Sequence, residues 1–140
     1  MLANVLEVVF DIKGDERGKL IVMEGLTPKI PFDVKRTFFI FDTTPGTVRG
    51  KHAHHKNRQM LVCVSGACTI ECEFPDGQRR DYRLDWPDKG LLVEGMIWHN
   101  MKEFSKDAVL LVLASEKYDP ADYVRDYAEF KRLCAEATNC

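Results

Sequence analysis

The sequence predicts an all-β domain that ends in a single α-helix. Short runs rich in Val, Ile, Leu and Phe recur along most of the 140 residues, and turn-forming residues separate them. Near residue 119 the pattern changes, and apolar residues then recur at helical spacing. No low-complexity linker interrupts the chain, so we expect one domain over residues 1–140. Strands of this number and spacing are typical of a β-sandwich or barrel of jelly-roll type.

Each candidate strand is a run of β-branched, aromatic or aliphatic residues bounded by residues that favour turns. The expected strands are Val5–Ile12, Lys19–Glu24, Arg36–Asp42, Thr47–His54, Gln59–Val64, Ala67–Phe74, Gln78–Leu84, Gly90–Glu94, Ile97–Glu103 and Ala108–Ala114. Asp76-Gly77 stands between two of these runs and is a strong signal for a hairpin turn.

The helix is expected from about Pro120 to Glu136. Asp119 is suited to the N-cap, proline is favoured at the first helical position, and Asp122 adds a negative charge to the first turn. The residues expected on the buried face are Tyr123, Tyr127, Phe130 and Cys134. Their spacing predicts an amphipathic helix that packs on the sheet.

Composition argues against several classes of function. The net charge of -2 gives no electrostatic reason to expect nucleic acid or an anionic membrane as a partner. No apolar run approaches the ~18–20 residues of a membrane span, and the N-terminus resembles no secretory signal, so we expect a cytoplasmic protein. The five cysteines form no C-x-x-C pair, which favours a packing role over a disulfide or zinc framework.

Three of the four histidines lie within residues 52–55. Because side chains alternate along a strand, His52 and His54 should point to one face and His55 to the other. Two converging imidazoles can bind a metal ion, or can act as a proton donor and acceptor near neutral pH. The pattern alone leaves both uses open.

The spacing of His52, His54, Gln59 and Gly66 resembles the first motif of the cupin superfamily, and the segment that ends at His99 resembles a remnant of the second. The resemblance implies that His99 approaches the other two histidines inside the barrel. Metal-binding cupins carry Glu where this chain has Gln59. Gln is a weaker, neutral ligand, which favours proton transfer over tight metal binding, although three imidazoles could still hold Zn, Fe or Ni.

Beyond that motif, nearly the whole chain resembles the nucleotide-sugar 3,4-ketoisomerases. The matching strings are Arg17-Gly18-Lys19-Leu20, Ile30-Pro31-Phe32-Asp33-Val34-Lys35-Arg36, Arg49-Gly50-Lys51-His52-Ala53-His54, Cys63-Val64-Ser65-Gly66, Gly95-Met96-Ile97-Trp98-His99-Asn100-Met101, Leu110-Leu111-Val112-Leu113-Ala114-Ser115, and Tyr118-Asp119 with Asp122-Tyr123. One departure is Thr37-Phe38-Phe39, where the family often has tyrosines.

The resemblance implies a jelly-roll homodimer with exchanged N-terminal strands that works without metal or redox cofactor. Its substrate would be dTDP-4-keto-6-deoxy-glucose, whose keto group moves from C4 to C3. A PLP-dependent aminotransferase would then form a 3-amino-3,6-dideoxy sugar, of the kind found in lipopolysaccharide O-antigens.

The resemblance also implies roles for individual residues. His54 would transfer the carbon-bound proton and His52 the proton between the two oxygens. Arg49 is the first choice to stabilise the enediolate, with Lys51 the weaker one because it should point away from His52. The further substrate-binding candidates are Gln59 to orient a hydroxyl or an imidazole, Arg17 and Arg36 for the diphosphate, Trp98 as a wall of the sugar pocket, and His99.

Three other functions compete with this reading. A metal-dependent cupin enzyme would need bound metal for turnover. A non-catalytic module would bind the sugar nucleotide without exchanging its C3 proton. A nucleotide-sugar 3,5-epimerase would pair a His with an Asp and a Tyr in a longer chain, and the Arg49–His54 block does not resemble those enzymes.

Overall fold

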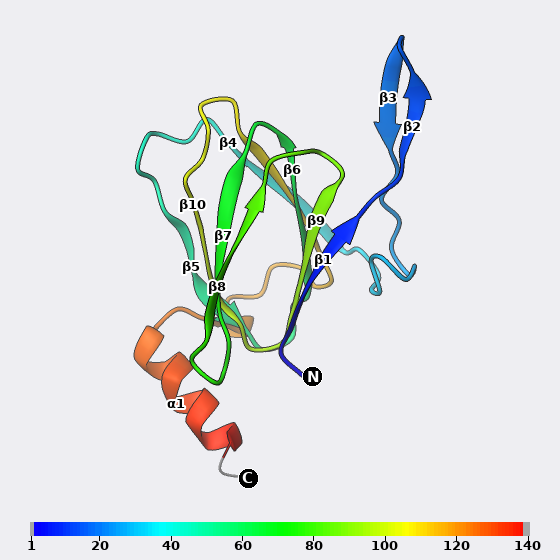
Figure 1. Cartoon of the computed structure of the whole chain (residues 1–140). Coiled ribbons are helices and arrows are strands. Elements are labelled where there is room, and N and C mark those ends of the chain that lie inside the picture. Colours follow the sequence, from blue (N-terminus) through cyan, green and yellow to red (C-terminus); the bar gives the residue numbers. More distant parts are fainter. Residues whose placement is uncertain (1, 139–140) are drawn as a thin grey trace.

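The computed structural model describes residues 2–138 and shows two antiparallel five-stranded sheets that face each other (Figure 1). The first sheet has the order β1 (Asn4–Val9), β9 (Lys89–Glu94), β6 (Gln59–Ser65), β11 (Val109–Ala114) and β4 (Arg36–Phe41). The second has the order β12 (Tyr123–Val124), β5 (Arg49–His54), β10 (Trp98–Lys102), β7 (Cys68–Glu73) and β8 (Arg79–Leu84). The chain also forms a hairpin of β2 (Ile12–Asp15) and β3 (Gly18–Ile21), and helix α1 (Tyr127–Thr138).

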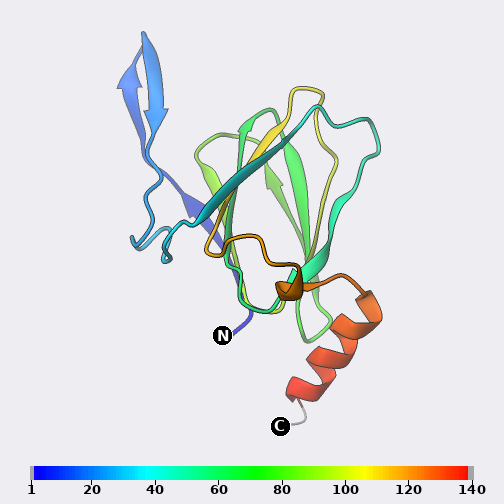
Figure 2. The ribbon, with the colours of Figure 1, turned by 180° about the vertical axis from the view of Figure 1, so that it is seen from behind.

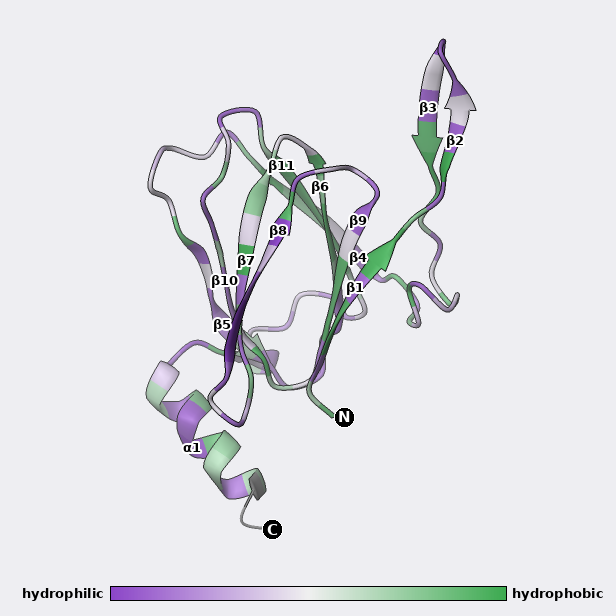
Figure 3. Ribbon diagram, in the orientation of Figure 1, coloured by the Kyte–Doolittle hydropathy of each residue, from purple (hydrophilic) through white to green (hydrophobic). Residues whose placement is uncertain are grey.

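The main core lies between the two sheets, where the inward-facing side chains of both meet. Its fully buried members include Leu61 and Leu91 of the first sheet and Ile70 and Cys72 of the second. The sheets do not close on each other, so the predicted sandwich is correct and the barrel is not. Figure 3 shows that hydrophobic residues follow β1, β6 and β9, whereas β5 and β8 are more hydrophilic.

The expected strands are found with one main difference, at the N-terminus. We predicted one strand over Val5–Ile12, but β1 ends at Val9. Phe10 then turns into a second apolar cluster and is only 3% exposed, while its N–H donates to the Asp88 carbonyl. The chain leaves the sheet there, and the β2–β3 hairpin projects from the body (Figures 1 and 2).

The predicted helix start is wrong. Asp119 does cap a helical turn by accepting a hydrogen bond from Ala121, but that turn is a short 3-10 segment over Pro120–Asp122. The next two residues form β12, and α1 begins only at Tyr127. A second cap signal explains the later start, because the Asp126 carboxylate accepts from the N–H of Ala128.

The described cysteines pack as predicted. The buried free thiols are Cys63, Cys68, Cys72 and Cys134, while Cys140 lies outside the described residues. Of the residues expected on the buried face of the helix, Phe130 and Cys134 are buried, whereas Tyr127 is 38% exposed and Tyr123 lies outside α1.

In the part of the chain that the structure describes, no helix combines the length and apolar character that crossing a bilayer requires.

Candidate active site

Three histidines converge between the sheets. His52 and His54 lie on one face of β5, as the alternation predicts, and His99 of β10 pairs directly with His52 across the ladder. The centroid of the His52 ring lies 4.8 Å from the centroid of the His54 ring and 4.8 Å from that of the His99 ring. The His54 and His99 centroids are 5.9 Å apart. His55 is exposed and takes no part.

Backbone carbonyls fix the proton position on two of these rings. His52 Nδ1 lies 3.0 Å from the Gly50 carbonyl oxygen, and His99 Nδ1 lies 3.2 Å from that of Ile97. A carbonyl only accepts, so each neutral ring carries its proton on Nδ1 and has a lone pair on Nε2. His99 Nε2 is buried and has no hydrogen-bond partner among the described residues.

Burial keeps all three rings neutral. Burial and the neighbouring His54 lower the pKa of His52 to about 4. Burial and His99 lower the pKa of His54 to about 4, although Asp122 acts in the opposite direction. Burial and His52 lower the pKa of His99 to about 3. Near pH 7 the three imidazoles are therefore proton acceptors, not proton donors.

A β-bulge interrupts β5 just before the histidines. His52 pairs with His99, but the next pair along β10 joins Asn100 to Gly50, so that Lys51 is an extra residue. Gly50 and Lys51 both adopt positive φ, at 87° and 59°. Glycine is required at the first position because a Cβ there would lie 2.8 Å from the His99 carbonyl oxygen.

The bulge turns Arg49 toward the histidines. In a regular strand Arg49, three residues before His52, would point to the opposite face. Here it pairs with Met101, which lies two residues from His99 on the same face of β10. Arg49 therefore lines the same cavity as His52, whereas Lys51 is exposed and does not line it.

That cavity has a volume of about 320 Å³ and receives side chains from both sheets. Its lining consists of Phe38, Phe39, Ile40, Arg49, Gly50, His52, Gln59, Met101, Tyr123 and Arg125. His54 and His99 are 3% and 1% exposed and do not line the cavity, but the centroid of each ring lies 4.8 Å from that of His52. Gln59 is 2% exposed, and its Oε1 has no protein partner among the described residues, so it is available to a substrate hydroxyl.

The prediction missed three functional candidates, Asp122, Tyr123 and Arg125. The centroid of the Tyr123 ring lies 5.0 Å from that of His52 and 4.5 Å from that of His54. Arg125 Cζ lies 4.2 Å from the Tyr123 centroid. We expected Tyr123 on a helix, covering the core. It belongs to β12 instead, which pairs Tyr123 with His54. Asp122-Tyr123 is one of the strings that match the family, and this match was the sequence signal that could have identified both residues as candidates.

Arg36 lies near the site but is not in the cavity wall. Its guanidinium carbon lies 5.3 Å from the Phe38 ring and 5.8 Å from the Tyr118 ring, and its Nε is buried without a described partner. Its charge is one of the smaller causes that lower the pKa values of His52 and His54.

Two candidates lie away from the cavity. Trp98 precedes His99 and so faces the other side of β10, where its ring packs against Tyr127 and Phe130; it does not wall the pocket. The Arg17 side chain is 85% exposed and pairs with Asp15 at 2.7 Å. Arg17 lies in the turn that joins β2 to β3 in the projecting hairpin. Within one chain it does not approach the histidines.

The histidines meet some of the requirements of a metal site. One ligand atom of each ring lies within 4.8 Å of the others. However, the fourth position of the cupin motif is the neutral Gln59, and the Asp122 carboxylate contacts the Nδ1 atom of His54 and is not among the grouped ligand residues. The donor set therefore fits a tightly held divalent metal poorly, and no catalytic step is derived through one.

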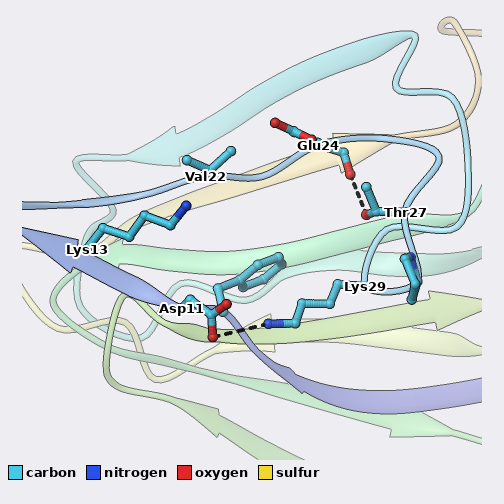
Figure 4. A pocket seen from close by; sticks show the side chains of 8 residues that line it. Asp11, Lys13, Val22, Glu24, Thr27 and Lys29 are labelled. Carbon is cyan, nitrogen blue, oxygen red and sulfur yellow. Dashed lines mark hydrogen bonds and ion pairs between the residues drawn. The ribbon is translucent and has the colours of Figure 1, made fainter.

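A separate cavity, also about 320 Å³, lies where the hairpin joins the body (Figure 4). Two contacts link its polar residues: Lys29 lies 3.7 Å from Asp11, and Thr27 donates to the Glu24 carbonyl at 2.8 Å. None of its lining residues is a histidine.

Comparison with known proteins agrees with the geometry. The sequence matches the family described as FdtA: WxcM-like, C-terminal, over residues 4–135. It is 44% identical over 123 residues to the TDP-4-oxo-6-deoxy-alpha-D-glucose-3,4-oxoisomerase of Aneurinibacillus thermoaerophilus, which covers 87% of this chain and 86% of that protein.

Solved structures give the same result. A 3,4-ketoisomerase from Helicobacter canadensis has a TM-score of 0.89 and 39% identity, over 94% of this chain and 98% of that one. A mutant of QdtA, a 3,4-ketoisomerase from Thermoanaerobacterium thermosaccharolyticum in complex with TDP-4-keto-6-deoxyglucose, has a TM-score of 0.91 and 36% identity, over 97% of each chain. The predicted resemblance is confirmed: the chain belongs to the FdtA family of WxcM-like, C-terminal proteins, and the relatives described above are 3,4-ketoisomerases of this fold.

Proposed function

We propose that this protein is an isomerase that moves the keto group of TDP-4-keto-6-deoxy-glucose from C4 to C3. The observation that carries the proposal is the neutral His52–His54 pair beside a cavity that also presents Arg49 and Gln59. Two of the relatives named above support this substrate: the Aneurinibacillus thermoaerophilus enzyme is named for TDP-4-oxo-6-deoxy-alpha-D-glucose, and the QdtA mutant is in complex with TDP-4-keto-6-deoxyglucose.

The proposed reaction needs only proton movements. The C4 ketone acidifies the C3 proton, and neutral His54 removes it to leave an enediolate across C3 and C4. The resulting imidazolium returns that proton to C4. His52 moves the O3 hydroxyl proton to the other oxygen of the enediolate, so that a ketone remains at C3. No proton, electron or atom is gained or lost overall.

Positive charge at the cavity would stabilise the enediolate. Arg49 is suited to this task because the bulge directs it into the cavity and because guanidinium donors stabilise a developing oxyanion. Gln59 would orient a sugar hydroxyl through its unpartnered oxygen. Arg36 remains a candidate for the diphosphate, since an arginine fork matches phosphate oxygens.

We further propose that the protein is a homodimer with exchanged N-terminal strands. The projecting hairpin, the strand β4 and the connection between β8 and β9 leave large apolar side chains in solvent, among them Leu20 (55%), Phe39 (58%), Phe41 (61%) and Trp86 (58%). Apolar surface of this kind marks an interface. The hairpin of one subunit would then cover the sheet of the other and bring Arg17 to the partner's site. Sedimentation of the full chain tests this proposal, and a monomer at micromolar concentration would refute it.

The cytoplasm is the proposed location, which agrees with four buried cysteines that remain as free thiols.

Incubation with TDP-4-keto-6-deoxy-glucose in D₂O tests the function. Proton NMR should show conversion to a 3-keto isomer and exchange at the reacting carbons. The His54→Asn variant should lose both signals, while His52→Asn should convert more slowly but retain exchange at C3. Binding with neither isomerisation nor exchange would favour a non-catalytic module and refute the proposal.

The proximity of the three imidazoles gives the metal-dependent alternative one supporting observation. Metal analysis and chelation decide between the two. We expect turnover to survive extensive treatment with a chelator. Loss of turnover that one equivalent of Zn²⁺, Fe²⁺ or Ni²⁺ restores would overturn the metal-free mechanism.

A further inference from the structure

The carboxylate of Asp122 is held on three sides. Its Oδ1 accepts from the backbone N–H of Lys56 at 2.6 Å, and its Oδ2 accepts from that of Asn57 at 3.1 Å. Oδ2 also lies 3.1 Å from His54 Nδ1. Asp122 is 8% exposed and His54 3%, so water does not compete strongly with these contacts.

These contacts determine the proton position on His54. Backbone N–H groups only donate, and an ionised carboxylate only accepts. The neutral His54 ring must therefore carry its proton on Nδ1 and donate it to Asp122. Its Nε2 is left with a lone pair, and this atom is buried without a hydrogen-bond partner among the described residues.

The fold ties the two residues together by their backbones as well. Tyr123, the neighbour of Asp122, pairs with His54 in the ladder between β12 and β5. The Asp122 carbonyl accepts from the N–H of His55 at 3.0 Å. The carboxylate is thus fixed relative to the ring by the sheet, and not by a flexible side chain alone.

His54 differs in this respect from the other two histidines. His52 and His99 face neutral backbone carbonyls through Nδ1, at 3.0 and 3.2 Å. His54 alone among the three is backed by an anion. A carboxylate behind Nδ1 stabilises the imidazolium that forms when Nε2 accepts a proton, as it does in hydrolase triads. The arrangement therefore singles out His54 as the ring best suited to accept a carbon-bound proton.

We propose that Asp122 is a positioning residue for catalysis: it fixes the Nδ1–H tautomer of His54 and stabilises the charged ring during proton transfer. The catalytic part of this inference rests on the proposed function, whereas the tautomer does not.

The tautomer can be measured in the unmodified protein. Proton–nitrogen correlation NMR of ¹⁵N-histidine-labelled full-length protein distinguishes the two tautomers by their nitrogen shifts, and the His54→Asn variant assigns the signal. We expect His54 to carry its proton on Nδ1 near pH 7. A proton on Nε2 would refute the inference whatever the enzyme's substrate.

The Asp122→Asn variant tests the consequence. An amide keeps one oxygen for the short bond from Lys56, and its NH₂ group then faces His54 Nδ1 and favours the opposite tautomer. We expect kcat to fall by about 10²–10³-fold with KM changed by less than about 3-fold, together with an Nε2–H signal for His54.

Asp119→Asn is the matched control. Asp119 caps the same 3-10 segment through Ala121 and contacts no histidine, so its variant should keep both kcat and the wild-type tautomer. Wild-type kcat in Asp122→Asn would refute the catalytic role. Absence of any isomerisation by the wild-type protein would refute the proposed function and leave the tautomer to be decided by NMR.

Discussion

The second sheet carries two buried polar clusters, one around Glu73 and one formed by the three histidines, and they differ in whether their polar atoms have hydrogen-bond partners. Glu73, at the end of β7, is 4% exposed and lies beneath helix α1. Its carboxylate accepts from Tyr127 at 2.8 Å, from Arg79 at 2.9 Å and from Lys131 at 3.1 Å, so both of its oxygens have partners. At the three histidines, by contrast, the Nε2 atoms of His54 and His99 have no partner among the described residues.

The difference also shows in protonation. Burial alone would raise the pKa of Glu73, but hydrogen bonds from Tyr127, Lys131 and Arg79 lower it overall. At the histidines burial dominates and lowers the pKa. A buried carboxylate whose hydrogen bonds are all formed anchors a helix, whereas a buried imidazole nitrogen without a partner keeps a lone pair that can accept a proton. The comparison predicts that the first cluster controls stability and the second controls turnover.

The largest effect is expected from His54→Asn. Removal of the proposed base should lower kcat by about 10²–10⁴-fold, because general acid–base catalysis typically contributes that much. The free energy of unfolding should change little, since the asparagine relieves a buried unpaired nitrogen. Steady-state kinetics and urea unfolding measure the two quantities. The control is His55→Asn, on the exposed neighbour, and equal losses in both variants would break the comparison.

Arg49→Met should come next, with kcat lower by about 10²-fold, the typical loss for one donor to an oxyanion. Lys51→Met serves as its control, because Lys51 carries the same charge but is exposed outside the cavity. If the two variants lost activity equally, long-range charge would explain the effect better than the direction imposed by the bulge.

Glu73→Gln should affect stability and not turnover. The amide cannot accept from three donors as the carboxylate does, so we expect about 1–3 kcal/mol less stability in urea unfolding. At temperatures well below the unfolding transition, kcat should stay within about 2-fold of wild type. A large kcat loss with unchanged stability would show that the Glu73 cluster is coupled to the site.

The smallest effect concerns pH. The folded-state pKa values of about 4, 4 and 3 for His52, His54 and His99 lie below the ordinary value of 6.5. As pH falls from about 6.5 toward 4, the unfolded chain binds protons that the folded chain does not, so stability declines through that window. Between pH 7 and 6 we expect each histidine to contribute a loss of about 0.7 kcal/mol, or about 2 kcal/mol in all. A smaller slope in His99→Gln would support this origin, and an unchanged slope would contradict it.

Most of the fold could be predicted because strand alternation and turn residues are local signals. The same local rule placed His52 and His54 on one face. The helix start could not be predicted, since Asp119 and Asp126 both carry cap signals and only long-range pairing decides between them. That pairing joins Tyr123 to His54, which also explains why Tyr123 was assigned to the wrong element.

Arg49 shows a second limit of sequence reasoning. It was chosen for its charge and its place in the matching motif, although regular alternation would have pointed it away from His52. The bulge that reverses its direction depends on the ladder with β10, more than 40 residues along the chain from Gly50, as the pairing of Gly50 with Asn100 shows. No local pattern reports such a pairing.

The bulge also determines whether the segment between Arg49 and His52 can lose a residue during evolution. A descendant that lost Lys51 could form a regular ladder and would still point Arg49 to the face of His52, two positions away. The segment can therefore lose or regain one residue without moving its arginine out of the cavity. Gly50 has no such freedom, because any side chain there would meet the His99 carbonyl at 2.8 Å. Position 51 can thus be deleted without loss of the arginine's direction, whereas the neighbouring position 50 must remain glycine.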